Sequence, residues 1–232
     1  MFIKMKNKKT KTPIIYEDND IIVIDKPAGM LSISTDKESR NTAYRAINDY
    51  VKSKHKSNRI WIVHRLDRDT SGVMLFAKSE RVKFLLQENW EKVAIGREYV
   101  AVVNGRVKPT ERRITSWLKQ TKTLLVYSSK REGDGKIAIT NYKVRQVANK
   151  YSLLDISLET GRKNQIRVHM KDIGHSVVGD KKYSGVNTAN PLGRLGLHAS
   201  ALTVKHPTTG AEMRFESTVP KCFTRLFNED SK

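Results

Sequence analysis

The sequence is poor in cysteine, in long apolar segments and in acidic residues. Cys222 is the single cysteine among 232 residues, which excludes an intrachain disulfide and a cysteine-based metal site. A chain with so little cysteine suits a reducing compartment. No apolar segment approaches the roughly 20 residues that span a bilayer, and the first residues carry lysines without the apolar segment of a secretory signal. We therefore expect a cytoplasmic protein with no membrane partner.

Acidic residues are few in relation to basic ones. The chain holds 24 Asp and Glu against 44 Lys and Arg, which gives a net charge of +20. A surplus of this size predicts a polyanionic partner, with nucleic acid ahead of a membrane surface. A basic composition without such a partner is the alternative. Residues 1–12 contain Lys4, Lys6, Lys8, Lys9 and Lys11, and this run predicts a flexible basic tail.

The hydrophobic pattern alternates between strand-like and helix-like segments. Apolar runs bounded by turn residues predict strands at 21–24, 99–103, 137–147, 151–158, 199–205 and 212–215, the last two forming a hairpin. Helical spacing predicts helices at 41–54, from Ser79 to Trp90, and at 164–173. Residues 106–136 show only a weak pattern. Interleaved elements with hairpins in the second half predict an α+β fold, with a mixed, mostly antiparallel central sheet flanked by helices.

A dense polar cluster interrupts the apolar stretch at residues 62–78, which reads IVHRLDRDTSGVMLFAK. This pattern predicts two strands joined by a loop, and loops between rigid strands often carry functional residues. Asp67 lies between Arg65 and Arg68. Guanidinium groups near a carboxylate favour its ionised form, which can act as a nucleophile or a base. From these residues alone, an ordinary turn with an Asp–Arg ion pair is the alternative.

The nonamer HRLDRDTSG at residues 64–72 resembles the signature of the RluA family of RNA pseudouridine synthases. Further segments are similar to the family's other motifs: YEDNDIIVIDKPAG at 16–29, REY at 97–99 and TGRKNQIRVHM at 160–170. The resemblance extends over roughly residues 14–220. One departure is visible, because the family usually has His where this chain has Asn164.

The resemblance implies an isomerisation of uridine in RNA that needs neither a cofactor nor a metal ion. The glycosidic bond breaks, and the uracil rotates and rejoins the sugar through carbon 5. Asp67 matches the family's essential aspartate, which would attack the sugar, attack the base or deprotonate the sugar. Arg167 matches the arginine that pairs with this aspartate, and Tyr99 the tyrosine that stacks on the uracil and takes the carbon 5 proton. Arg65 matches the residue that fills the space left by the flipped base.

The same resemblance implies the pseudouridine synthase fold, as one catalytic domain over residues 13–232 without a separate N-terminal RNA-binding module. We expect a monomer that acts on ribosomal or transfer RNA. Further RNA contacts are expected from His64, Arg68, Arg162, Lys163, Asn164 and Gln165.

Other functions remain as alternatives. A non-catalytic RNA-binding module on the same fold would most simply lack the aspartate, but Asp67 is present. A zinc deaminase needs more cysteines than this chain has, and a metal-dependent nuclease needs clustered carboxylates, which are few in these motifs. Taken singly, Tyr99 would be interpreted as a core tyrosine and Arg167 as part of a surface ion pair.

Overall fold

The computed structural model describes residues 12–35, 41–185 and 188–228. The tail predicted for residues 1–12 therefore lies outside the described residues, apart from its last residue. The chain divides into two compact units, each built from two separate segments. Unit 1 consists of Met1–Gly96 and Ala199–Thr218, and unit 2 of Arg97–His198 and Val219–Lys232. The single catalytic domain over residues 13–232 stays a prediction.

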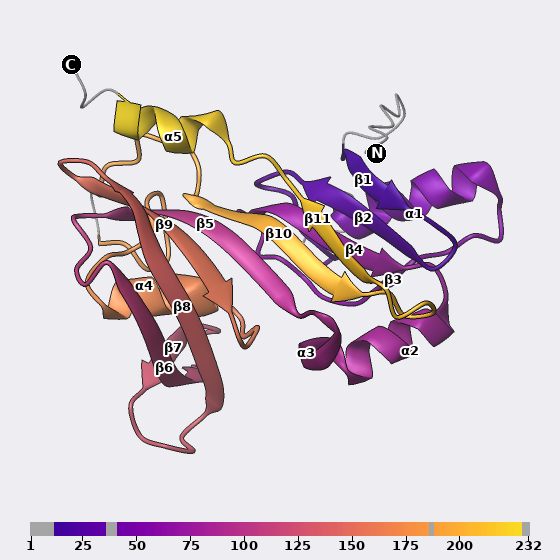
Figure 1. Cartoon of the computed structure of the whole chain (residues 1–232), viewed down its shortest axis with the longest axis horizontal. Helices are drawn as coiled ribbons and strands as arrows, with labels where there is room; N and C mark the ends of the chain where they lie inside the picture. The colour runs from indigo at the N-terminus through magenta and orange to yellow at the C-terminus, as the bar shows by residue number, and fades with distance from the viewer. Residues whose placement is uncertain (1–11, 36–40, 186–187, 229–232) are drawn as a thin grey trace. The chain divides into compact units, whose positions relative to one another are not determined.

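Unit 1 is built on strands in the order β1-β2-β4-β10-β11 (Figure 1), and the pairs β1–β2, β2–β4 and β10–β11 are antiparallel. In β2 and β4, Ile21 lies opposite Ala77 and Lys26 opposite Gly72. The short strand β3 also pairs with β4. The bounds are β1 Ile14–Glu17, β2 Ile21–Lys26, β3 Trp61–Ile62, β4 Ser71–Ala77, β10 Leu197–Lys205 and β11 Glu212–Glu216; the helices are α1 Ala43–Lys54, α2 Glu80–Glu88 and α3 Trp90–Val93.

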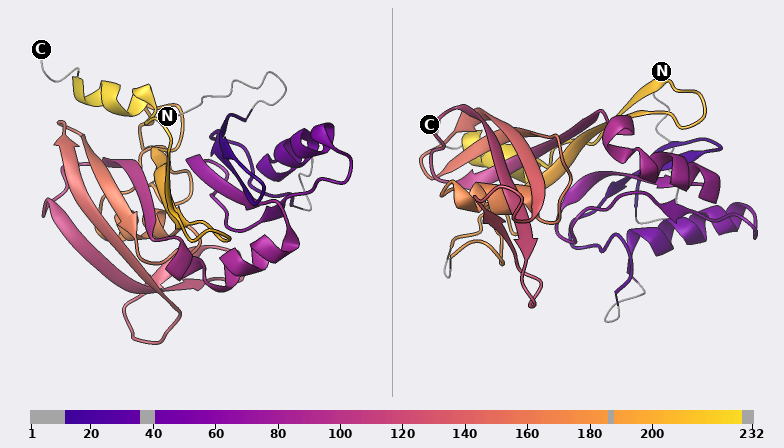
Figure 2. Two further views of the ribbon diagram at one scale, coloured as in Figure 1. Left: turned by 45° about the vertical axis from the view of Figure 1, so that its right-hand side comes forward. Right: turned by 90° about the horizontal axis from the view of Figure 1, so that it is seen from below.

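The core of unit 1 follows from two strands that are apolar at consecutive positions. Residues 21–24 of β2 and 73–77 of β4 are all buried, so both faces of these strands are covered. Helices α1 and α2 flank the strands (Figure 2). Each begins at a residue whose hydroxyl accepts a backbone N–H of the first turn, Thr42 for α1 and Ser79 for α2. These caps set where the helices start.

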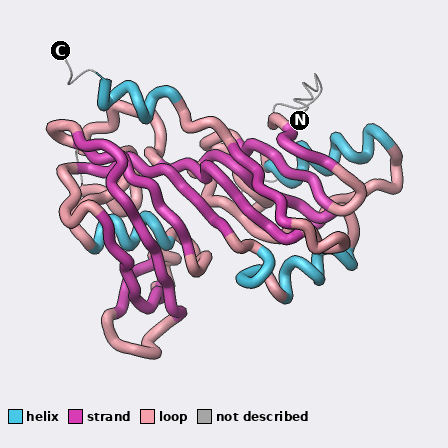
Figure 3. The backbone as a smooth tube through the Cα atoms, viewed as in Figure 1, coloured by secondary structure: helices cyan, strands magenta, loops and turns pink. Residues whose placement is uncertain are grey.

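Unit 2 contains a five-stranded antiparallel arrangement in the order β5-β9-β8-β6-β7. In Figure 3, the strands are joined by loops and the helices are short. The two helices of this unit lie on opposite faces of its strands. Alternate residues of β5 point to opposite faces, and Ala101 packs with α4 residues whereas Val102 packs with α5 residues. The bounds are β5 Gly96–Asn104, β6 Glu111–Gln120, β7 Val126–Ser129, β8 Lys136–Val147, β9 Tyr151–Leu158, α4 Gln165–Asp172 and α5 Lys221–Asn228.

The expected fold class is confirmed, since the elements form a mixed α+β protein whose strands pair mostly in the antiparallel direction. Helices predicted at 41–54 and 164–173 appear as α1 and α4, and the C-terminal hairpin appears as β10 and β11. Across the described ranges, no helix combines the length and apolar character needed to cross a lipid bilayer.

Candidate active site

The loop between β3 and β4 carries Asp67, and its backbone is held on both sides of this residue. The hydroxyl of Ser32 accepts a hydrogen bond from the Leu66 N–H at 3.1 Å and donates one to the Leu66 carbonyl at 2.7 Å. The Asp67 carbonyl itself accepts from the N–H of Thr70 at 3.2 Å, which closes a turn. The side chain of Leu66 is buried, whereas Asp67 is half-buried. A buried residue thus anchors the loop beside the carboxylate.

The fully buried side chain of Lys26 provides a second anchor. Its Nζ donates to the carbonyls of Arg68 at 3.0 Å, Met30 at 2.7 Å and Pro27 at 3.0 Å. Three carbonyls match the three donors of an ammonium group, which a buried lysine needs. In return, the Arg68 Nε donates to the carbonyl of Gly29 at 3.2 Å. The turn after β2 and the Asp67 loop are therefore linked twice.

The residues around Asp67 differ in what they offer to a ligand. Arg65, Arg68 and Asp69 are exposed. His64 instead has an internal role: its Nε2 accepts from the Leu75 N–H at 3.0 Å, and its ring stacks on Trp90 with centroids 4.7 Å apart. This leaves the arginines as the outward-facing cations of the loop.

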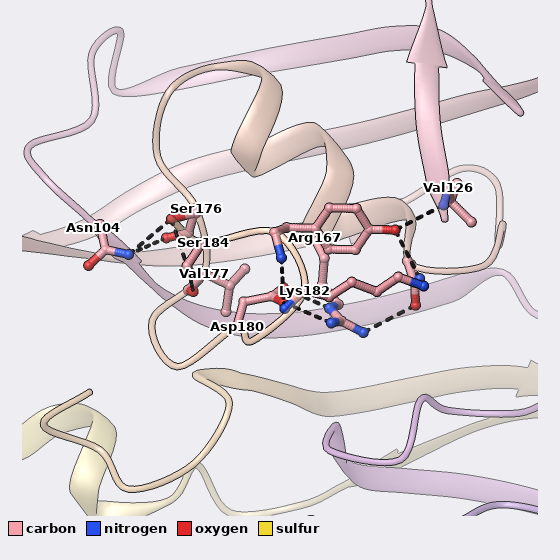
Figure 4. Close-up of polar contacts among 10 residues, drawn as sticks. Asn104, Val126, Arg167, Ser176, Val177, Asp180, Lys182 and Ser184 are labelled. Atoms are coloured by element: carbon pink, nitrogen blue, oxygen red, sulfur yellow. Dashed lines mark hydrogen bonds and ion pairs between the residues drawn. The ribbon is translucent and has the colours of Figure 1, made fainter. Parts of the chain in front are cut away.

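In unit 2, Tyr99 lies on β5 and Arg167 in the first turn of α4. Tyr99 is half-buried, lies opposite Ile156 of β9 and packs against the apolar cluster beneath α4. Arg167 binds both carboxylate oxygens of Asp180, through Nε at 2.7 Å and Nη2 at 2.8 Å, as Figure 4 shows. Its Nη1 donates to Oδ1 of Asn164 at 3.2 Å. The ion pair expected for an isolated Arg167 is thus present, but it is nearly buried, with the arginine side chain 12% exposed.

The start of α4 is fixed by a buried amide. Oε1 of Gln165 accepts from the Thr160 hydroxyl at 2.8 Å and the Arg162 N–H at 2.9 Å, and its Nε2 donates to the Ile139 carbonyl at 3.0 Å and to Oγ1 of Thr140 at 2.9 Å. All four positions that an amide offers are occupied within the protein. Gln165 therefore holds the helix against β8.

A buried histidine on the same helix makes the second polar link to the strands. His169 lies between the hydroxyls of Ser116 and Thr140, each 2.9 Å from a ring nitrogen. Burial disfavours the charged imidazolium, and it lowers the pKa of His169 to about 4. The helix that carries Arg167 is consequently tied to β6 and β8 by neutral groups.

The residues predicted to contact RNA differ in exposure, and His64 among them is half-buried. Arg65, Arg68 and Lys163 are exposed, whereas Asn164 and Gln165 are buried and bonded within unit 2. Arg162 is half-buried, and its Nε donates to the Ile137 carbonyl at 3.0 Å. In the part of the chain that the structure describes, no three His, Cys, Asp or Glu side chains gather closely enough to hold a metal ion.

Sequence reasoning did not assign functions to Lys26, Asp180 or Tyr183. Asp180 and Tyr183 follow the third motif, and the only available signal was a Gly-Asp pair after a predicted helix. Lys26 was recognised as part of a turn after a strand. A lysine next to proline and glycine ordinarily lies at the surface, so its burial could not be expected.

The chain matches the family model described as RNA pseudouridylate synthase over residues 20–172, a range that includes Asp67, Tyr99 and Arg167. It is 34% identical to the ribosomal large subunit pseudouridine synthase D of Pseudomonas aeruginosa, over 93% of this chain and 70% of that protein. It is 32% identical to an uncharacterised RNA pseudouridine synthase of Bacillus subtilis, over 94% of this chain and 76% of the relative. The solved structure of human RNA pseudouridylate synthase domain containing 4 shares the fold, with a TM-score of 0.75 at 22% identity, covering 94% of this chain and 92% of that one.

Proposed function

The chain belongs to the RNA pseudouridylate synthase family, and we propose that it isomerises specific uridines of ribosomal or transfer RNA to pseudouridine. Family membership makes the protein an isomerase that acts on RNA. The name of the Pseudomonas relative favours ribosomal RNA as the substrate. The observation that carries the proposal is the complete HRLDRDTSG motif on a loop whose backbone is fixed on both sides of Asp67. A rigid mount is what a catalytic carboxylate needs, because small displacements reduce rates steeply.

In this proposal, Asp67, Tyr99 and Arg167 act together on one uridine. Asp67 attacks the sugar or the base, or removes a proton from the sugar, and each route uses an ionised carboxylate. Arg167 supplies the guanidinium that pairs with and orients this carboxylate in the proposed reaction. Tyr99 stacks on the uracil and takes the proton from carbon 5 once the new bond has formed. The reaction is redox-neutral and leaves the atoms of the nucleotide unchanged, so we propose no cofactor and no metal ion.

Recognition rests on exposed cations in this proposal. A base inside folded RNA has to leave its stack, which costs a few kcal/mol. Arg65 is exposed next to Asp67, and its planar guanidinium can stack where the base was. Arg68 and Lys163 contact phosphates, and with a net charge of +20 the affinity for RNA falls as salt rises. Asn164 and Gln165, which are bonded internally, take positioning roles. The protein acts as a monomer in the cytoplasm.

The experiment that tests this function compares pseudouridine maps of total RNA from cells with and without the gene. One or a few positions should lose pseudouridine. The purified protein should restore them in RNA from the deficient cells, whereas Asp67→Asn should bind that RNA with near-parental affinity and form no pseudouridine. Asp69→Asn is the matched control, because Asp69 is an exposed carboxylate on the same loop.

Two outcomes would refute parts of the proposal. Pseudouridine formation by Asp67→Asn at the parental rate would show that another residue carries the chemistry. A parental protein that binds RNA but leaves all uridines unchanged would favour the non-catalytic RNA-binding module.

A further inference from the structure

The carboxylate of Asp180 is held in place by backbone groups as well as by Arg167. Its side chain is completely buried. Oδ1 accepts from the backbone N–H groups of Lys182 at 2.9 Å and Tyr183 at 3.1 Å, in addition to Nη2 of Arg167. A carboxylate that accepts several N–H groups is held in one orientation. Asp180 therefore presents both oxygens to the guanidinium as a rigid, two-point acceptor (Figure 4).

Asn164 holds the guanidinium from a second side. Its backbone has φ 56°, in the left-handed region that Asn tolerates better than most residues. Oδ1 accepts from Nη1 of Arg167, and Nδ2 donates to the Tyr183 hydroxyl at 3.0 Å. That hydroxyl also accepts from the N–H of Val126 at 3.2 Å, which anchors it to β7. The amide oxygen of Asn164 thus binds the arginine, and the amide nitrogen binds the Tyr183 hydroxyl beside it.

Tyr183 closes the arrangement from a third side. The carbon of the Arg167 guanidinium lies 5.2 Å from the centroid of the Tyr183 ring. This is within the range of a cation–π contact. Asp180, Asn164 and Tyr183 thus contact one guanidinium through two ion-pair bonds, one hydrogen bond and one ring face. Asp180 and Tyr183 lie outside α4, and the pair of Arg167 with Asp180 is nearly buried, so ordinary surface ion pairing does not account for the set.

We infer that Asp180, Asn164 and Tyr183 are positioning residues that hold the Arg167 guanidinium in one orientation for pseudouridine formation. The inference rests on the proposed function of Arg167. An arginine side chain loses rotamer freedom when it is fixed. Here the protein fixes it during folding, so the loss is not incurred again when RNA binds. The hydrogen bonds to Asp180 and Asn164 use three of the five N–H donors of the guanidinium, and the set determines the direction in which the group acts.

The test separates positioning from stability by using two substitutions at one site. Asn164→Gly removes the side chain and suits the left-handed backbone, whereas Asn164→Ala removes it and adds backbone strain. Both should lower kcat for pseudouridine formation by about tenfold or more with little change in KM, since misplaced groups cost rate. Both lose the buried hydrogen bonds of the amide, but Asn164→Ala should lower the melting temperature further, because only it adds backbone strain. If the loss of kcat instead follows the melting temperature, the role of Asn164 is structural and the inference is wrong.

A double-mutant cycle tests whether Asn164 acts through Arg167. Arg167→Lys keeps the charge but removes the planar fork. If Asn164 works by orienting that fork, Asn164→Gly should lower kcat no further in the Arg167→Lys protein, because the two changes remove the same interaction. Independent, multiplicative losses would overturn the inference. Lys181→Ala, an exposed neighbour of Asp180, is the control and should keep kcat within about twofold, as surface changes usually do.

A measurement on the free protein distinguishes this inference from the proposed function. The Nε–H of Arg167 should give a slowly exchanging NMR signal, identified by its disappearance in Arg167→Lys. In Asp180→Asn the turn amides keep an oxygen acceptor but the ion pair is lost, so this signal should exchange faster, as it should in Asn164→Gly. Rapid exchange in the parental protein would refute the positioning set even if pseudouridine forms. A protected signal in a protein without activity would refute only the proposed function.

Discussion

The Nζ of Lys26 donates a hydrogen bond to the carbonyl of Arg68 at 3.0 Å, joining residues 42 positions apart in the sequence. The bond connects the end of β2 to the residue that follows Asp67. Because Lys26 is completely buried, its ammonium has no exposed position to move to. The lysine of the KPAG segment therefore acts as a brace for the loop rather than as a contact for RNA.

Replacing Lys26 with Met keeps most of the side-chain volume but removes the ammonium. The carbonyls of Pro27, Met30 and Arg68 then lose a donor, and an unsatisfied buried acceptor costs about 1–3 kcal/mol. We expect a loss of about 2 kcal/mol or more in the free energy of unfolding, measured by urea denaturation. Lys52→Met on the exposed side of α1 is the control and should be nearly neutral. Equal stability of the two variants would show that Lys26 is not a brace.

We expect that adding one methyl group at Gly72 lowers the free energy of unfolding severely. A Cβ at this position would lie 2.1 Å from the carbonyl oxygen of Ala199, and the backbone φ is +113°. Gly29 also has a positive φ, +81°, but a Cβ there would meet nothing within 4 Å. Gly29→Ala should therefore cost about 1–2 kcal/mol from backbone strain alone. Gly72→Ala should cost clearly more, because backbone atoms of β10 would have to move.

Urea denaturation of both glycine variants measures the difference. Similar midpoints for Gly29→Ala and Gly72→Ala would mean that β10 shifts easily away from β4. A lower midpoint for Gly72→Ala with unchanged steepness is the expected result, since steepness reports the surface exposed on unfolding.

Because of His169, we expect the folded protein to lose stability in mild acid. Its pKa is lowered from 6.5 to about 4 by burial, so between these values the unfolded chain binds a proton that the folded protein does not. Stability is therefore complete above pH 6.5 and decreases as the pH falls towards 4. At pH 5 the loss from this residue amounts to about 2 kcal/mol relative to pH 7.

Unfolding midpoints at pH 7 and pH 5 test the role of His169. His169→Gln should show a smaller difference between the two pH values than the parental protein, because the titrating group is gone. His55→Gln removes an exposed histidine and should leave the difference unchanged. An undiminished difference in His169→Gln would assign the acid sensitivity to other groups.

The sequence predicted the elements whose apolar pattern is regular. β2, β4, α1 and α4 appear close to their expected positions, because their buried residues are apolar and evenly spaced. The strand β6 was missed, since its buried side includes Ser116 between Ile114 and Leu118. Ser116 is buried because its hydroxyl meets His169 of α4. A partner 53 residues away in sequence leaves no local trace.

The spacing after Ser79 predicts a helix whose apolar face carries Val82, Leu85, Leu86 and Trp90, and this prediction is only partly correct. Val82 and Leu86 are buried as expected, but Leu85 is 39% exposed. Trp90 lies at the start of the separate helix α3 and stacks on His64. α2 buries only a narrow stripe, and periodicity alone does not show how wide the covering surface is.

The residues proposed to carry out the chemistry could be predicted from the sequence. The residues that hold them in place could be predicted less well. Asp67 and Arg167 belong to motifs that are readable in sequence. Asp180 lies 13 residues beyond Arg167 on a separate turn, and an isolated aspartate after glycine indicates only a turn. Burial and two-point pairing define its role, and both depend on the folded chain.

The core of unit 1 has a consequence for how the nascent chain matures on the ribosome. Leu202, Val204 and Phe215 pack with Val23 and Leu75 in one cluster, although β2 and β4 are translated more than a hundred codons earlier. The edge of β4 that pairs with β10 therefore stays unpaired until residues 197–205 have been translated. Exposed edges of this kind invite pairing with other chains, so biosynthesis of this enzyme should depend on chaperones that shield that edge during elongation.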